Sequence, residues 1–207
     1  MSNLILEFSF DDGHFLDKKV ARLLEKYGFT GTFFVPNVSI FDHKSLALVE
    51  AREMAKNGHK FGGHTKTHPS DMKLLDEEEL KEEITQNKMY VEMFIMKEQI
   101  DYFCYPKGKY NEGVIEALKK AGFKKARTTD VGQTTVPKNL FRWGTTVHIH
   151  PSRDEYKGQN WLEYAKEKFK ESQTGGYFHC WGHSEEINRY NLWDEFDELL
   201  KFVRDNM

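Results

Sequence analysis

The order of the predicted elements is what most constrains the fold of this chain. Apolar extended segments alternate with amphipathic segments of helical period along almost all 207 residues. Such alternation is typical of an α/β domain with a largely parallel sheet, either open or closed into a barrel. Strands are predicted at 4–11, 30–35, 60–63, 101–105, 123–129, 143–149 and 177–181, and helices at 20–27, 46–56, 76–96, 114–121, 161–169 and 192–203.

Length and composition indicate one globular domain over residues 1–207. Hydrophobic residues make up 39% of the chain, enough for one sizeable core. The formal net charge of −3 lacks the basic footprint of a nucleic-acid-binding protein. No apolar run is long enough to span a membrane, and the first residues lack the features of a signal peptide. We therefore expect a cytoplasmic protein, whose oligomeric state the sequence leaves open.

Polar residues follow several of the predicted strands at the point where each strand ends. Asp11, Asp12, His64, Pro106 and His183 all lie at or just past such a point. Because the carboxyl ends of parallel strands meet at one edge of a sheet or barrel, these residues are expected to gather there.

Two of these groups have the composition of a metal site. His64 and His68 are four residues apart and can face the same way across one helical turn. A carboxylate from the Asp11–Asp12 pair would complete a site of two histidines and one carboxylate with an open position. The alternatives are an ordinary Asp-Gly turn at Asp12-Gly13 and a surface loop that carries two histidines by chance.

The remaining reactive residue types allow simpler interpretations. His179 shares strand parity with His183 but lies deeper, which is typical of a hydrogen-bonded core histidine. Cys104 and Cys180 lie in apolar strands and are predicted to be inert small hydrophobes rather than nucleophiles, and two cysteines are too few for a disulfide framework. Residues 105–108 form either a plain turn or a wall that offers a backbone N–H to an oxyanion. The other histidines are predicted to be solvated or structural: His14, His43, His59, His148 and His150.

Taken together, these segments resemble the motifs of the polysaccharide deacetylase family, carbohydrate esterase family four. Ser9-Phe10-Asp11-Asp12-Gly13 is similar to the first motif, T-F-D-D-G, and His64-Thr65-Lys66-Thr67-His68 is similar to the second, H-[ST]-x-x-H. Cys104-Tyr105-Pro106-Lys107-Gly108 keeps part of the third, R-x-P-x-G, and Trp181-Gly182-His183 is similar to the last, L-x-H. The motifs occur in the family's order and span most of the chain.

The resemblance implies a fold, a cofactor and a set of roles. The fold would be a distorted (β/α) barrel with about seven parallel strands. A divalent metal, usually zinc, would be held by Asp12, His64 and His68. Asp11 would be the general base and His183 the general acid.

The chain departs from the family pattern in two places. Cys104 stands where the family has an arginine that contacts the catalytic aspartate, and the fourth motif has no clear match, residues 127–130 being the nearest stretch. We hypothesise that Arg127 restores the missing positive charge from a different strand.

The resemblance implies metal-dependent hydrolysis of an N-acetyl group on an amino sugar or a polysaccharide. The first alternative is a related hydrolase of a small, non-polymeric amide, such as a formyl or ureido group. The second is a catalytically silent carbohydrate-binding barrel, which would have lost a metal ligand or the base. Five aromatic residues are candidates for the walls of a sugar site, although core packing is the simpler expectation for each: Tyr105, Trp143, Trp161, Trp181 and Trp193.

Overall fold

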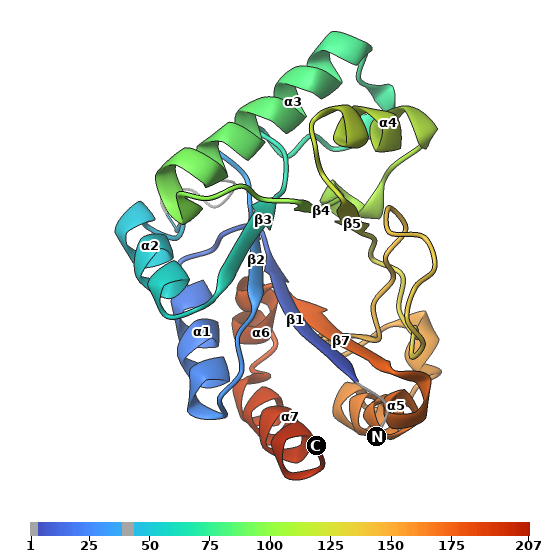
Figure 1. Cartoon of the computed structure of the whole chain (residues 1–207). Helices are drawn as coiled ribbons and strands as arrows, with labels where there is room; N and C mark the ends of the chain where they lie inside the picture. Colours follow the sequence, from blue (N-terminus) through green and yellow to red (C-terminus); the bar gives the residue numbers. More distant parts are fainter. Residues whose placement is uncertain (1–3, 39–43) are drawn as a thin grey trace.

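The computed structural model describes residues 4–38 and 44–207, and one curled sheet of seven parallel strands forms its centre (Figure 1). The strands follow the order β5-β4-β3-β2-β1-β7-β6, so the predicted (β/α) barrel is confirmed. Their bounds are β1 Ile5–Asp11, β2 Thr32–Val35, β3 Lys60–Gly63, β4 Tyr102–Cys104, β5 Lys125–Arg127, β6 Val147–His148 and β7 Tyr177–Gly182.

The barrel is distorted because its edge strands, β5 and β6, do not pair with each other. Irregular backbone between them crosses this gap: Thr128 N–H donates to Trp143 O over 3.0 Å, and Thr146 N–H donates to His179 O over 2.9 Å. The extended segments predicted at 123–129 and 143–149 are therefore only three and two residues long as strands. Among their other backbone groups, the Thr145 N–H donates to Asp130 O within this crossing segment, whereas the Lys124 N–H donates to Asp101 O and the Ile149 N–H to Trp181 O.

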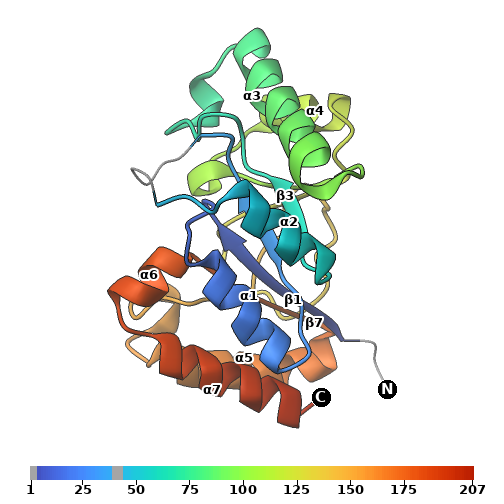
Figure 2. The same cartoon turned by 90° about the vertical axis from the view of Figure 1, so that its left-hand side faces the viewer.

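Helices lie along the outer face of the sheet (Figures 1 and 2). None of the described helices combines the length and the apolar composition that a membrane span requires. The helix bounds are α1 Asp17–Lys26, α2 Leu48–Lys56, α3 Glu77–Tyr90, α4 Glu112–Lys120, α5 Trp161–Gly175, α6 Ser184–Arg189 and α7 Trp193–Asp205. Shorter helical turns are η1 Met72–Leu74, η2 Val91–Met96, η3 Pro106–Gly108 and η4 Asp154–Tyr156.

Two helices differ from the sequence prediction. The helix predicted at 76–96 begins with a capping box, in which Asp76 and Glu79 each accept the other's backbone N–H over 2.9 Å. It is α-helical only to Tyr90 and continues as the π-helix η2, which ends at the left-handed Lys97 (φ 57°). Helix α6 was missed, because its six residues are too few to show a hydrophobic period.

Strand parity divides the core into an apolar outer layer and a polar barrel interior. On β1, Phe8 and Phe10 are buried among aromatic rings; Phe10 lies 5.8 Å from Phe196 of α7, centroid to centroid. The alternate residues of β1 face the interior, where Ser9 Oγ lies 2.7 Å from His179 Nε2. Burying a polar group costs free energy unless it has a hydrogen-bond partner, and the inward-facing polar side chains meet this need by bonding to one another.

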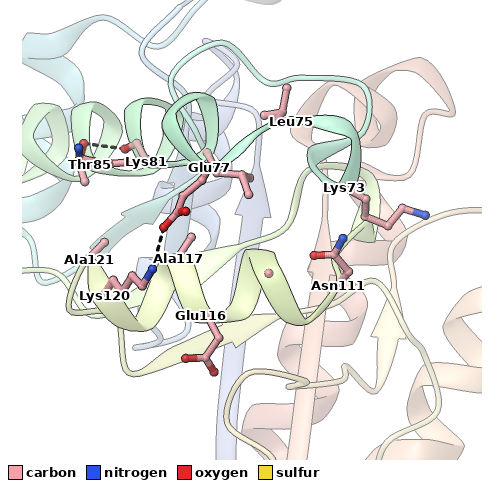
Figure 3. A pocket seen from close by; sticks show the side chains of 12 residues that line it. Lys73, Leu75, Glu77, Lys81, Thr85, Asn111, Glu116, Ala117, Lys120 and Ala121 are labelled. Carbon is pink, nitrogen blue, oxygen red and sulfur yellow. Dashed lines mark hydrogen bonds and ion pairs between the residues drawn. The ribbon is translucent and has the colours of Figure 1, made fainter.

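A surface groove of about 610 Å³ lies between α3 and α4, away from the strand ends (Figure 3). Leu80 and Ala117 lie in its lining, and Glu77 and Lys120 form an ion pair there over 2.8 Å. It contains none of the residues that the sequence marks for chemistry.

A buried carboxylic acid ties two helix starts together close to the strand ends. Asp17, the first residue of α1, is 0% exposed, and its Oδ1 accepts a hydrogen bond from Ser184 Oγ over 2.5 Å. Its Oδ2 has no hydrogen-bond partner among the described residues. Burial raises the pKa of Asp17 well above its ordinary value. The folded protein therefore holds a proton on Asp17 at a pH where the unfolded chain has released it.

Replacing Asp17 with asparagine tests this proton. Because the native pKa is raised, the free energy of unfolding of the wild type falls as pH increases above the unfolded value, by at most about 1.4 kcal/mol per unit. Asp17→Asn removes that loss, so urea unfolding should show a gain in stability that is larger at pH 8 than at pH 5. The control Asp205→Asn, at an exposed position in α7, should show no such trend. A gain from Asp17→Asn of the same size at both pH values would contradict the prediction.

Candidate functional site

Asp12, His64 and His68 converge at the carboxyl ends of β1 and β3. His64 Nε2 lies 3.1 Å and His68 Nε2 lies 3.3 Å from the same oxygen, Asp12 Oδ1. The three side chains are 14%, 2% and 13% exposed, in the order of their numbers, so the site is shielded but open to one side. The structure thus brings together the three residues that the sequence proposes as metal ligands.

The convergence comes from turns rather than from the helical turn that the spacing allowed. Thr65 and His68 have positive φ angles of 65° and 56°, and Asp12 has one of 77°. Left-handed backbone in residues other than glycine costs energy and is frequent at functional sites. These conformations return the loop after β3 toward Asp12, which itself follows β1 directly.

Hydrogen bonding leaves a lone pair of His64 directed at the Asp12 carboxylate. His64 Nδ1 lies 2.8 Å from the carbonyl oxygen of Cys104, which can only accept, so Nδ1 carries the hydrogen. In the neutral imidazole, Nε2 therefore has a lone pair that faces a carboxylate oxygen. Two acceptors 3.1 Å apart repel each other unless a cation or a proton lies between them. Two imidazole nitrogens and one carboxylate oxygen are a donor set that suits a divalent metal, and the residues present fit one.

Asn87 fixes the backbone at His64 and was not identified from the sequence. It is fully buried in α3; its Oδ1 accepts the His64 N–H over 2.7 Å and its Nδ2 donates to Val35 O over 2.9 Å. A signal was present: Asn87 falls on the buried stripe of α3 that includes Leu80 and Ile84. A polar residue on such a stripe needs a buried partner.

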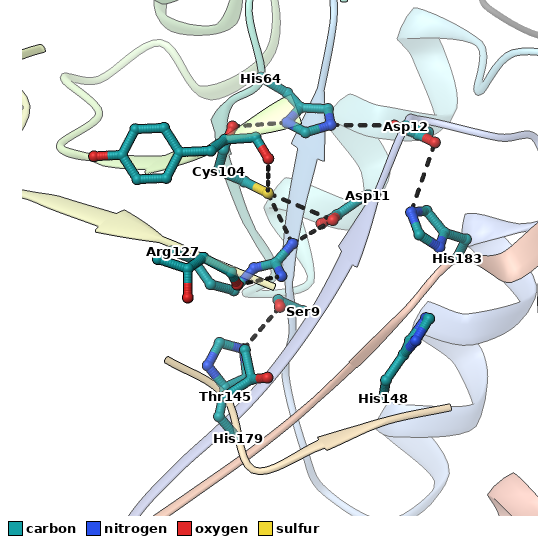
Figure 4. A network of polar contacts seen from close by, with 12 residues as sticks. Ser9, Asp11, Asp12, His64, Cys104, Arg127, Thr145, His148, His179 and His183 are labelled. Atoms are coloured by element: carbon teal, nitrogen blue, oxygen red, sulfur yellow. Dashed lines mark hydrogen bonds and ion pairs between the residues drawn. The ribbon is translucent and has the colours of Figure 1, made fainter. Parts of the chain in front are cut away.

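Asp11 points the other way, into the barrel interior, where it forms an ion pair with Arg127 (Figure 4). Cys104 Sγ lies 3.4 Å from Asp11 Oδ2 and 2.8 Å from the Arg127 guanidinium. Burial alone would raise the pKa of Asp11, but the positive charge and hydrogen bond of Arg127, together with His64 and His183, outweigh burial, and the pKa lies below its ordinary value. Asp11 Oδ1 is buried without a hydrogen-bond partner among the described residues. The hypothesis that Arg127 supplies a positive charge to the catalytic aspartate agrees with this contact.

The β4–β5 register explains how Arg127 reaches Asp11. Cys104 and Arg127 are directly paired residues of these neighbouring strands. The guanidinium of Arg127 thus lies beside the position from which a side chain at 104 would approach Asp11. Burial raises the pKa of the Cys104 thiol well above its ordinary value, so the thiol is neutral and the prediction of an inert cysteine agrees with its environment.

His183 approaches the site from the end of β7. Its Nε2 lies 3.7 Å from Asp12 Oδ2 (Figure 4). Its Nδ1 lies 2.6 Å from Glu186 Oε2. Burial lowers the pKa of His183, but Glu186 and the two aspartates raise it to about 9. Glu186 belongs to α6. Asp130, the acidic residue in the stretch nearest to the fourth motif, bonds to Thr128 Oγ1.

The structure confirms some of the sequence predictions for the other histidines and the aromatic residues and corrects others. His179 is a hydrogen-bonded core residue, as predicted. His148 does not fit the prediction of a histidine with no constellation around it, because its Nε2 lies 3.2 Å from Glu186 Oε2. His59 is structural and accepts Gly31 N–H over 3.0 Å; His43 lies outside the described residues.

Most of the aromatic residues proposed for a sugar site are packed in the core instead. Four of them are at most 5% exposed: Tyr105, Trp143, Trp161 and Trp181.

A model of the polysaccharide deacetylase family matches residues 4–126, more than half of the chain. Over 121 residues, 58% of this chain and 54% of the relative, the chain is 28% identical to a peptidoglycan N-acetylglucosamine deacetylase of Bacillus cereus. It is 28% identical over 117 residues, 56% of this chain and 43% of the relative, to the peptidoglycan N-acetylmuramic acid deacetylase PdaA of Bacillus subtilis. The chain spans about half the length of the curated relatives that it matches.

Solved structures show the same fold. A family 4 carbohydrate esterase from Streptomyces lividans, in complex with acetate, is similar with a TM-score of 0.66 at 16% identity, over 99% of this chain and 91% of that one. The family match covers the strands β1 to β4 and ends within β5, one residue before Arg127; it includes Asp11, Asp12, His64 and His68. The chain belongs to the polysaccharide deacetylase family.

Proposed function

We propose that this chain is a metal-dependent hydrolase that removes an N-acetyl group from an amino sugar of an oligosaccharide or polysaccharide. One observation carries the proposal: Asp12, His64 and His68 converge on one point, with Asp11 and His183 beside it. The activity in the names of the curated relatives, removal of acetyl groups from peptidoglycan sugars, supports the same reaction class.

Asp12, His64 and His68 are the proposed ligands of the metal. Their donor set of two imidazole nitrogens and one carboxylate oxygen suits zinc. A bound divalent metal would supply a Lewis acid for the acetamide carbonyl and a water of lowered pKa. A second ligand group, Asp11, His64 and Cys104, is the poorer choice, because the positive charge of Arg127 lies against two of its members.

Asp11 is the proposed general base. Its carboxylate is ionised because Arg127 holds its pKa low, and its unpartnered Oδ1 has free lone pairs to accept a proton from the attacking water. His183 is the proposed general acid, with Nε2 directed at the site and Nδ1 held by Glu186. As the C–N bond breaks, Nε2–H would protonate the departing amine nitrogen. The backbone N–H groups near Lys107 remain a proposed contact for the oxyanion.

Removal of Asp12 tests the metal site. Wild-type protein, loaded with zinc and desalted, should hold about one zinc per chain and release acetate from N-acetylglucosamine oligomers. Asp12→Ala should lose both the zinc, measured by elemental analysis, and the acetate release. The control Asp101→Ala, at an exposed aspartate before β4, should keep both. Full zinc content in an inactive Asp12→Ala variant would contradict the ligand role. Parallel assays with formyl and ureido compounds distinguish a small-amide hydrolase.

An exchange of two side chains tests the role of Arg127. Arg127→Cys leaves Asp11 as an unpaired buried carboxylate, which costs about 3–5 kcal/mol of stability, and should abolish most acetate release. The double variant Cys104→Arg/Arg127→Cys places a guanidinium on the neighbouring strand, in the space that Arg127 vacates. It should recover a large part of both the melting temperature and kcat.

The control for this exchange is Lys125→Cys, which removes the other interior cation of β5. Lys125 pairs with Glu7 over 2.6 Å and does not contact Asp11. This variant should therefore retain acetate release. Activity of Arg127→Cys equal to that of the wild type would refute the proposed role, as would a double variant that regains stability but no activity.

A further inference from the structure

Behind His183, on the side away from Asp12, three more side chains form a chain of hydrogen bonds that the proposed reaction does not yet use. Glu186 lies next to His183, His148 next to Glu186, and Arg153 next to His148. Glu186 comes from α6, His148 from β6, and Arg153 from the loop before η4. None of the four belongs to the segment that the family model matches.

One oxygen atom of Glu186 accepts hydrogen bonds from both histidines. Glu186 Oε2 lies 2.6 Å from His183 Nδ1 and 3.2 Å from His148 Nε2. Burial alone would raise the pKa of Glu186, but the hydrogen bonds from the two histidines lower it far below its ordinary value. Glu186 is therefore a carboxylate, which can only accept hydrogen bonds. Both ring nitrogens that face it must carry a hydrogen.

Arg153, at the outer end of this series of hydrogen bonds, determines which atoms donate and which accept. Its guanidinium nitrogen lies 3.2 Å from His148 Nδ1, and a guanidinium can only donate. His148 Nδ1 therefore accepts, and the one hydrogen of the neutral imidazole is on Nε2, where it faces Glu186. Burial lowers the pKa of His148 to about 4, which agrees with a neutral ring. The ring is also held in place by Trp181, which stacks on it with centroids 3.9 Å apart and planes within 8°.

The same geometry determines which nitrogen of His183 serves the reaction. Because the hydrogen on Nδ1 of His183 is donated to Glu186, His183 can release or take up a proton only at Nε2. This atom lies 3.7 Å from Asp12 Oδ2. We propose that Glu186, aligned by His148 and Arg153, is the positioning residue that keeps His183 in the form with a hydrogen on Nδ1. The inference rests on the proposed deacetylase function for its effect on rate, since the proton leaves Nε2 for the amine nitrogen as the C–N bond breaks.

A metal ion on the same three groups is the competing explanation. His148 Nε2, His183 Nδ1 and Glu186 Oε2 are close enough together to hold one. The fixed positive charge of Arg153 next to His148 disfavours a second cation there. Such an ion would also take Nδ1 of His183 as a ligand and leave Glu186 no hydrogen to accept from it.

Two kinds of substrate separate positioning from a merely structural role. An N-acetyl amide needs a proton on its leaving nitrogen, whereas the phenolate of 4-nitrophenyl acetate departs without one. Glu186→Gln keeps the shape of the side chain and removes its charge. It should lower kcat for N-acetylglucosamine oligomers by about 30- to 100-fold and leave 4-nitrophenyl acetate hydrolysis within about threefold. Glu186→Asp should recover part of the lost amide activity, and Arg153→Met should show a smaller loss with the same substrate dependence.

The matched control is Glu185→Gln, one residue earlier in α6. Glu185 pairs with Arg189 over 2.7 Å and does not contact His183. It should behave as the wild type with both substrates. Equal losses of the two activities in Glu186→Gln would overturn the proposal. So would a second equivalent of zinc in the wild type that disappears in Glu186→Gln.

Nitrogen-15 NMR of labelled histidine tests the proposal without any turnover. At a pH above the His183 pKa of about 9, the neutral imidazole should carry its one hydrogen on Nδ1 in the wild type and should shift toward the Nε2–H form in Glu186→Gln. A neutral wild-type His183 with its one hydrogen on Nε2 would overturn the inference even in an active enzyme. Conversely, the expected tautomer in a protein that releases no acetate would uphold the positioning role and refute the proposed function alone.

Discussion

The ion pair between Asp11 and Arg127 in the barrel interior is the interaction on which the rest of the site depends. Its side chains are 4% and 0% exposed, so each charge has lost its water, and the opposite charge of the pair is the main group that offsets that cost. The pair holds Asp11 inward and ionised, with one oxygen unpartnered. The next residue, Asp12, then turns outward through a left-handed conformation toward the two histidines. Two adjacent carboxylates thereby acquire different environments and can serve different roles.

Parallel strands account for the assembly of the other groups. β1, β3 and β7 all present their carboxyl ends to one edge of the barrel, so the residues that follow them meet there although they lie far apart in the sequence. The side chains that orient these groups come from elsewhere. Asn87 of α3 fixes the His64 backbone, and Glu186 of α6 receives the Nδ1 hydrogen of His183. The reactive atoms are thus held by elements packed on the sheet as well as by the strands that carry them.

Local pattern was enough to predict the seven strands and to bring His64, His68 and a carboxylate of the Asp11–Asp12 pair to one edge, because strand alternation and strand ends are short-range properties. The choice of Asp12 over Asp11 came from the family resemblance. It failed where a side chain's role depends on a neighbour distant in the chain. His148 has an unremarkable sequence context, and its contact with Glu186 exists only because β6 lies beside β7 and α6 follows β7. The spacing of His64 and His68 correctly predicted that the two side chains lie together, but the expected helical turn was wrong. A turn with two left-handed residues brings them together instead.

By itself the sequence determined the alternation of elements and the family to which the chain belongs, because both depend on residues close together along the chain. Only the packed barrel decided how the missing arginine is replaced. Cys104 leaves a space beside Asp11, and the β4–β5 register places Arg127 next to that space. It also decided that Glu186 would support His183. Register and helix placement follow from how the whole core packs, and no local segment carries that information.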